Sequence, residues 1–107
     1  MIQVVYHREH HRLTAIGHAH SGESGHDLVC ASVTALVLTM AANVASLVTQ
    51  GSAGKHIVRV QEGDAEISCV PHHKMKAVVT LIYDTVCTGF ELLQTLYPEN
   101  ITYQVLG

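Results

Sequence analysis

Residues 17–30 read GHAHSGESGHDLVC and bring together three histidines, three glycines and a cysteine. A run without charged residues follows, from position 28 to position 54. Histidine and cysteine at such short spacing suit two chemistries. A cysteine can act as a nucleophile with a histidine as its base, or imidazole nitrogens and a thiolate can hold a zinc ion.

Cys30 is the predicted nucleophile. We expect a helix over Asp27–Gln50 with Asp27 as its N-cap, which would place Cys30 in the first turn. Backbone N–H groups without intrahelical acceptors and the positive end of the helix dipole gather there, and both favour a thiolate over a thiol. We expect N–H groups at Cys30 and its neighbours to stabilise the oxyanion of an acyl-transfer reaction.

His18 is the predicted general base, because it ends a predicted strand and stands between the small residues Gly17 and Ala19. A glycine-rich loop then leads to the helix, and it consists of Ser21, Gly22, Glu23, Ser24 and Gly25. We expect this loop to fold back so that His18 faces Cys30, and to move when a peptide substrate binds.

Two other interpretations of this segment stay open. No CxxC or HExxH pairing is present, but a zinc ion could take three nitrogens and one sulfur from His18, His20, His26 and Cys30. Alternatively, the cysteine is only a small buried side chain. Six further histidines lie in or beside turns and element ends, where we expect most to be solvated: His7, His10, His11, His56, His72 and His73.

The composition narrows the class of protein. With 107 residues, 48% of them hydrophobic, the chain has the size of one domain, and we predict a single domain over residues 1–107. A net charge of −3 without a cluster of Lys and Arg argues against nucleic acid as a direct partner. The N-terminal MIQVVYHREHH does not resemble a secretion signal, and an odd number of cysteines favours a reduced, cytoplasmic protein. We interpret Cys69 and Cys87 as packing residues.

The elements that must position these residues follow from hydrophobic periodicity and turn signals. We expect strands over Ile2–His7, Arg12–His18, His56–Gln61, Ala65–Val70 and Ile101–Leu106. A second helix should have Pro71 in its first turn and end at Tyr97. The order ββαββαβ predicts a two-layer α+β fold, with a mainly antiparallel sheet of about five strands and both helices on one face.

Each predicted helix has an apolar face. On the first helix this face holds Val29, Val33, Leu36, Val37, Met40, Val44 and Leu47. A polar stripe lies opposite, formed by Ser32, Thr39, Asn43, Ser46 and Gln50. This two-sided pattern favours a core helix over a membrane span. On the second helix the apolar stripe holds Met75, Val78, Val79, Ile82, Val86, Phe90, Leu93 and Tyr97.

At the candidate site the sequence resembles the bacterial ribosomal-processing cysteine proteases of the Prp (YsxB-like) family. The resemblance rests on Gly17-His18-Ala19, on Gly25-His26-Asp27-Leu28-Val29-Cys30-Ala31, and on the spacing of twelve residues from histidine to cysteine. The chain length and the order of elements agree as well, so the resemblance covers the whole chain.

This resemblance implies a homodimeric cysteine endopeptidase of the bacterial cytoplasm, without cofactor, metal or membrane contact. The implied substrate is the precursor of the large-subunit ribosomal protein twenty-seven, whose N-terminal extension is removed for ribosome maturation. Carried over by position, Cys30 is the nucleophile and His18 the base, while Asp27 either orients the histidine or only caps the helix. Thr34 stands where many relatives have serine, so a hydroxyl remains. A non-enzymatic ribosome-assembly or adaptor module stays open as the alternative.

Overall fold

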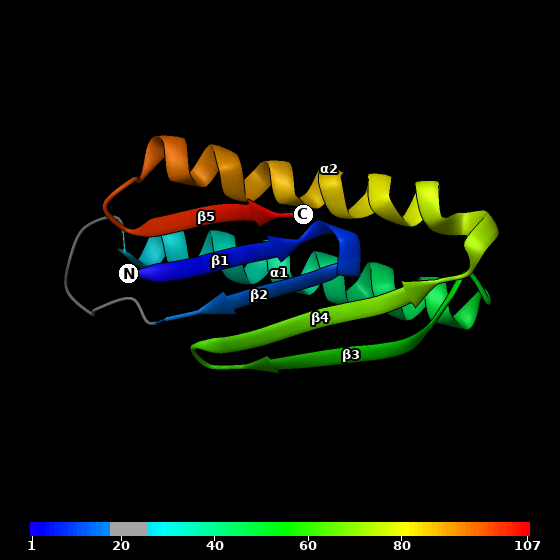
Figure 1. Ribbon diagram of the computed structural model, residues 1–107. Coiled ribbons are helices and arrows are strands. Elements are labelled where there is room, and N and C mark those ends of the chain that lie inside the picture. The colour runs from blue at the N-terminus through cyan, green and yellow to red at the C-terminus, as the bar shows by residue number, and fades with distance from the viewer. Residues whose placement is uncertain (18–25) are drawn as a thin grey trace.

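The protein is a two-layer α+β structure, shown in Figure 1. The computed structural model describes residues 1–17 and 26–107, with the backbone alone at residues 26 and 27. The chain forms, in order, β1 (Ile2–His7), β2 (Arg12–Ile16), α1 (His26–Thr49), β3 (Ala53–Gln61), β4 (Asp64–Pro71), α2 (Lys76–Leu96) and β5 (Ile101–Leu106). The predicted fold class and the order ββαββαβ are confirmed.

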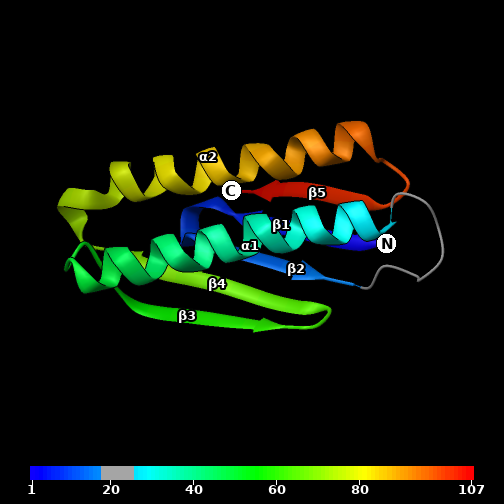
Figure 2. The same cartoon turned by 180° about the vertical axis from the view of Figure 1, so that it is seen from behind.

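The five strands form one sheet in the order β3-β4-β2-β1-β5. Three neighbouring pairs are antiparallel, and only β1 and β5 pair in parallel. Alternate side chains of the three inner strands face the helices and are buried: Ile2, Val4, Tyr6, Leu13, Ala15, Ala65, Ile67 and Cys69. Both helices lie on this face, as the view from behind in Figure 2 shows.

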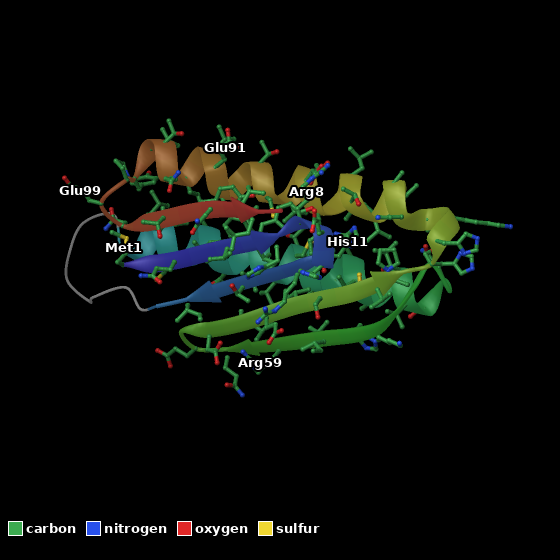
Figure 3. All side chains as sticks on the ribbon, in the orientation of Figure 1. Met1, Arg8, His11, Arg59, Glu91 and Glu99 are labelled. Carbon is green, nitrogen blue, oxygen red and sulfur yellow. The ribbon has the colours of Figure 1, made fainter. Side chains whose placement is uncertain are left out.

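The other face of the sheet carries a cluster of ion pairs. The guanidinium of Arg59 contacts Asp64 at 2.9 Å and Glu66 at 3.2 Å, and Glu66 also accepts from Arg12 at 2.8 Å. Figure 3 shows the side chains of this face and labels Arg59 near the β3 edge. Arg12, Arg59 and Asp64 are exposed by more than two fifths, whereas the Glu66 side chain that joins the two arginines is only 15% exposed.

α1 crosses the sheet obliquely, with its first turns over β1 and its last turns beside β3 and β4 (Figure 2). Its buried residues are those predicted, with Leu36 only partly buried: Val29, Val33, Val37, Met40, Val44 and Leu47. By length and composition alone, Leu28–Thr49 is apolar enough to cross a membrane. Packing against the sheet accounts for the 28% of the most apolar stretch that is buried, while Leu28 and Leu38 on other faces are exposed.

A Schellman motif ends α1. The N–H of Ser52 donates to the carbonyl of Leu47 at 2.8 Å, and the N–H of Gly51 donates to Val48 at 3.1 Å. Gly51 has a φ of 77°, a left-handed conformation that glycine adopts without strain. The helix thus ends within one residue of the predicted Gln50, and Gly51 turns the chain into β3.

On α2 the predicted apolar stripe was partly wrong. The buried residues are Val79, Tyr83, Cys87 and Phe90, whereas Val78 is 44% exposed. The buried face is therefore centred on a tyrosine and a cysteine that the stripe omitted. Tyr83 can occupy the core because its hydroxyl donates to the carbonyl of Ile67 at 3.2 Å.

Two predicted boundaries also differ from the structure. Pro71 is the last residue of β4 and does not belong to α2, because the 3₁₀ turn His73–Met75 separates the two elements. β3 begins at Ala53, before the predicted His56. A register shift between Gly54 and Ile57 interrupts its pairing with β4, and this irregularity hid the early start from an alternation pattern.

Candidate active site

A cavity of about 430 Å³ lies between the first half of α1 and the tip of the β3–β4 hairpin. The side chains that α1 contributes to its wall are Cys30, Val33, Thr34 and Val37. The sheet contributes an apolar floor and a polar rim: Ile2, Ala15, Gly17, Val60, Gln61, Glu62, Gly63, Asp64 and Ala65. Cys30 is a free thiol of intermediate exposure, so a ligand in this cavity would meet its sulfur.

The start of α1 shifts the predicted helix contacts. α1 begins at residue 26, so the backbone of Asp27 lies inside the first turn, and its prediction as the N-cap was wrong. Cys30 is the fifth helical residue, where helix geometry directs its N–H to the carbonyl of residue 26. The N–H groups of residues 26–28 are the ones without an intrahelical acceptor. These N–H groups therefore have no helical partner, whereas that of Cys30 does, and which of them would face an oxyanion stays a prediction.

Gly17 fixes the point from which the chain continues into His18. β2 ends at Ile16, two residues before the predicted end, because Gly17 has a φ of 129°. Its N–H donates to the carbonyl of Gly63 at 3.0 Å, and a Cβ atom here would collide with the carbonyl oxygen of Met1. Only glycine fits this position, which holds the chain against the hairpin tip at the cavity wall.

The other two cysteines are packing residues, as predicted. Cys69 and Cys87 are each 2% exposed. Burial raises the pKa of the Cys87 thiol to about 12, and burial likewise raises the pKa of Cys69. Of the three thiols in the chain, Cys30 is the one that lines the cavity.

The comparison with known families decides between an enzyme and an adaptor. The model of the cysteine protease Prp family matches residues 1–102. The chain belongs to this family. It is therefore a cysteine protease, which confirms the predicted resemblance and overturns the non-enzymatic alternative.

Solved structures with the Prp fold match nearly the whole chain. SMU.848 from Streptococcus mutans is 24% identical, with a TM-score of 0.68, and the match covers 99% of this chain and 94% of that one. The ribosomal processing protease Prp from Staphylococcus aureus, in complex with a substrate peptide, is 21% identical, with a TM-score of 0.69 and coverage of 97% and 96%. The same protease with a covalently linked product peptide is 23% identical, with a TM-score of 0.68 and coverage of 97% and 96%. No curated protein matches the chain.

Several predicted site residues lie outside the described part of the protein. These are His18, the loop residues Ser21, Gly22, Glu23, Ser24 and Gly25, and the side chain of Asp27. The pairing of His18 with Cys30 stays a prediction, as does the zinc alternative, which needs His20 and His26. Within residues 1–17 and 28–107, no group of three or more His, Cys, Asp or Glu side chains could hold a metal ion.

The hairpin tip is the part of the cavity that sequence reasoning missed. The predicted strands His56–Gln61 and Ala65–Val70 leave a turn between them, but the position of this turn beside α1 was not predicted. The contact joins segments that are far apart in sequence, and no local pattern signals it. Gln61, Glu62 and Asp64 give the cavity a polar rim, in which Asp64 is paired with Arg59.

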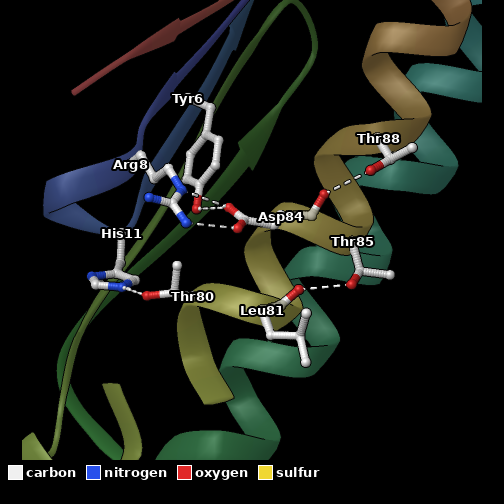
Figure 4. Close-up of polar contacts among 8 residues, drawn as sticks. All are labelled: Tyr6, Arg8, His11, Thr80, Leu81, Asp84, Thr85 and Thr88. Carbon is white, nitrogen blue, oxygen red and sulfur yellow. Dashed lines mark hydrogen bonds and ion pairs between the residues drawn. The ribbon is translucent and has the colours of Figure 1, made fainter. Parts of the chain in front are cut away.

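A second polar cluster lies away from the cavity and joins the β1–β2 connection to α2 (Figure 4). Arg8 donates to both carboxylate oxygens of Asp84, at 3.1 and 2.9 Å, and the hydroxyl of Tyr6 donates to the same carboxylate at 2.8 Å. The hydrogen bond from Arg8 lowers the pKa of Asp84, whereas burial raises the pKa of Tyr6. These groups satisfy one another, so the cluster is structural.

Most of the histidines outside the candidate site are exposed, as expected, and His11 is the exception because it is only 3% exposed. Its Nε2 lies 2.7 Å from the hydroxyl of Thr80, and its ring packs edge-on against Tyr83. Its φ of 47° follows the 3₁₀ turn Arg8–His10 and directs the side chain under α2. Burial, together with Lys76 and Arg8, lowers its pKa.

Proposed function

We propose that this protein is an endopeptidase that removes the N-terminal extension from the precursor of the large-subunit ribosomal protein twenty-seven, in the bacterial cytoplasm. It would act as a single domain over residues 1–107. Membership of the Prp family supports this proposal, and so does the fold shared with a ribosomal processing protease. The observation that carries it is the place of Cys30, a partly exposed thiol in the wall of the cavity beside the start of α1.

The proposed reaction is acyl transfer through a cysteine–histidine dyad. His18 takes the proton of the Cys30 thiol, and the thiolate forms a bond to the scissile carbonyl carbon while the π electrons move to oxygen. N–H groups of the first turn of α1 stabilise this oxyanion, each by about 3–4 kcal/mol in a comparable site.

The intermediate then collapses and the C–N bond breaks. His18 gives its proton to the leaving amine, and a thioester to Cys30 remains. Water, deprotonated by His18, attacks the thioester and releases the carboxylic acid, which restores the thiol. Asp27 is proposed either to orient the histidine or to act only as a residue of the first turn.

The test is incubation of the purified protein with a synthetic peptide that spans the processing site, followed by mass spectrometry of the products. Cys30→Ala should lower kcat by at least about a thousandfold, because the covalent step is lost. Thermal unfolding should change little, since Cys30 is only partly buried. Cleavage by Cys30→Ala at the unsubstituted rate would refute the proposal.

His18→Ala should be as inactive as Cys30→Ala, and His20→Ala is its matched control two residues further along the chain. The dyad predicts that His20→Ala keeps its activity. Equal loss in both histidine variants, together with one zinc ion per chain in protein purified without chelator, would contradict the dyad and favour the N₃S zinc site.

We also propose that the protein acts as a homodimer, as its family resemblance implies. Support comes from the outward face of α2, where Leu81, Leu92 and Leu96 are 65%, 58% and 69% exposed. Leucines so exposed along one helix are typical of a surface that meets another chain.

A further inference from the structure

β3 is an edge strand with an exposed apolar surface. Among residues 1–17 and 26–107 its one neighbour in the sheet is β4, so within this part of the chain the other side of its backbone is open at the sheet edge. Ile57, Val58 and Val60 are 47%, 43% and 42% exposed. A nine-residue edge strand with such side chains is a pairing site that proteins normally protect with charges, bulges or a covering element.

This edge leads directly into the cavity that contains Cys30. Val58 and Val60 pair with the buried Ile67 and Ala65, so all four lie on the face of the sheet that the helices cover. The oblique course of α1 leaves this end of β3 uncovered (Figure 2). Val60 itself forms part of the cavity wall.

The register shows which backbone groups point outward. Gln61 and Asp64 flank the two-residue turn and form the pair that closes the hairpin. In an antiparallel ladder only alternate residue pairs are hydrogen-bonded to each other. Since Gln61 and Asp64 form such a pair, Val60 and Val58 do not, and their N–H and C=O groups point away from β4. The irregularity near Lys55 lies before this stretch, so residues 57–61 keep a regular register.

We propose that one segment of the substrate peptide binds as an additional strand along the outer edge of β3, beside Val58 and Val60, and that the peptide beyond this segment enters the cavity at Val60, where its scissile bond meets Cys30. The inference rests on the proposed role of Cys30. An extended peptide supplies main-chain donors and acceptors at the same period of two residues as the edge strand. The continuity of the edge with the cavity wall is what identifies the occupant as the substrate.

Val58→Pro tests the proposal, because proline removes one outward N–H and leaves the inward ladder intact. Val58→Ala is the matched control, since it also removes the isopropyl group but keeps the N–H. With the processing-site peptide, KM should be roughly tenfold higher for the proline variant than for the alanine variant. Alkylation of Cys30 by iodoacetamide, a reagent that needs no strand pairing, should proceed at the same rate in both. Equal KM values would overturn the proposal.

A second measurement leaves the protein unchanged and places single backbone N-methyl groups along the peptide. The proposal predicts that cleavage is lost at alternate positions of the segment beside β3. A uniform response overturns strand addition, and if Cys30→Ala is inactive in the same assay, the proposed function still stands. The edge of β3 could instead pair with a second copy of the chain, and sedimentation of Val58→Pro tests this. If this variant alone changes from dimer to monomer, the edge pairs with a second copy and the proposal is wrong.

Discussion

Among single residues, Gly17 supports the candidate site without taking part in its chemistry. Its φ of 129° and its contact with the Met1 carbonyl exclude a side chain, and its N–H fastens it to Gly63. Gly51 provides a matched comparison, because it also has a positive φ of 77° but no atom within 4 Å of the Cβ position. Comparing alanine substitutions at the two glycines therefore separates the cost of backbone strain from the cost of a steric collision.

We predict that Gly17→Ala lowers the free energy of unfolding by about 2–3 kcal/mol, whereas Gly51→Ala lowers it by about 1 kcal/mol. Peptide cleavage should fall at least tenfold in Gly17→Ala, because His18 follows directly, and should be unchanged in Gly51→Ala. Urea unfolding and cleavage kinetics measure both. If the two variants lose equal stability and keep full activity, the collision with Met1 has no consequence.

At this scale the sequence identified the residue types and missed the contacts. Cys30 was expected from its neighbours, and the structure places it in the cavity wall. Gly17 was noted only as a small neighbour of His18, and its close contact with the Met1 carbonyl was not predicted. The role of Asp27 as a cap was wrong, because a helix start can move by one residue without any change in composition.

Between elements, the β1–β2 connection is fastened to α2 through a histidine held neutral. Burial, Lys76, Arg8 and His10 lower the pKa of His11, and Asp84 opposes them in part. The unfolded chain therefore binds this proton before the folded protein does. The contribution of neutral His11 to the free energy of unfolding is complete above the unfolded pKa of about 6.5. This contribution is lost as the pH falls from there through the lowered folded pKa.

We predict that the free energy of unfolding falls as the pH drops from about 6.5 through the lowered folded pKa of His11, with a slope of at most about 1.4 kcal/mol per pH unit for this one proton. His11→Asn should be less stable at pH 7.5, but its stability should vary less between pH 7.5 and pH 5.5. Asparagine tolerates the left-handed backbone of this position. Urea unfolding at both pH values measures the difference, and equal pH dependence in the two proteins would contradict the assignment to His11.

Elements were predicted more accurately than their ends and faces. β1 and β5 agree with the expected ranges, because alternation and turn residues mark both. The face of α2 was placed one position away at Val78, since Tyr83 enters the core only when a partner for its hydroxyl is available. That partner is the carbonyl of Ile67 on β4, and the periodicity of the α2 sequence gives no sign of it.

For the whole molecule, the arrangement of strands is what assembles the cavity. β5, near the C-terminal end of the sequence, pairs with β1, near its N-terminal end. The tip of the β3–β4 hairpin lies beside the start of α1. The sequence predicted a mainly antiparallel sheet but neither of these contacts. Their energy comes from burial shared among distant segments, which no window of the sequence reports.

The outward side of α2 leads to the prediction for the assembled protein. Exposed residues recur there at spacings of three and four: Val78, Leu81, Thr85, Thr88, Leu92 and Leu96. Thr85 and Thr88 donate their hydroxyls to carbonyls of their own helix, so they present methyl groups outward (Figure 4). An uncharged stripe of this spacing is suited to packing against a second helix.

We predict that the protein sediments as a dimer and that Leu81→Glu combined with Leu92→Glu raises the dimer dissociation constant at least about a hundredfold, because two carboxylates per chain would be desolvated. Val105→Glu is the control, since Val105 is 49% exposed on β5 at the far side of the sheet from β3. Iodoacetamide should still alkylate Cys30 in the double variant, because α2 contributes no residue to the cavity. Sedimentation equilibrium decides: a double variant that dimerises as tightly as Val105→Glu would place the contact between subunits elsewhere than on α2.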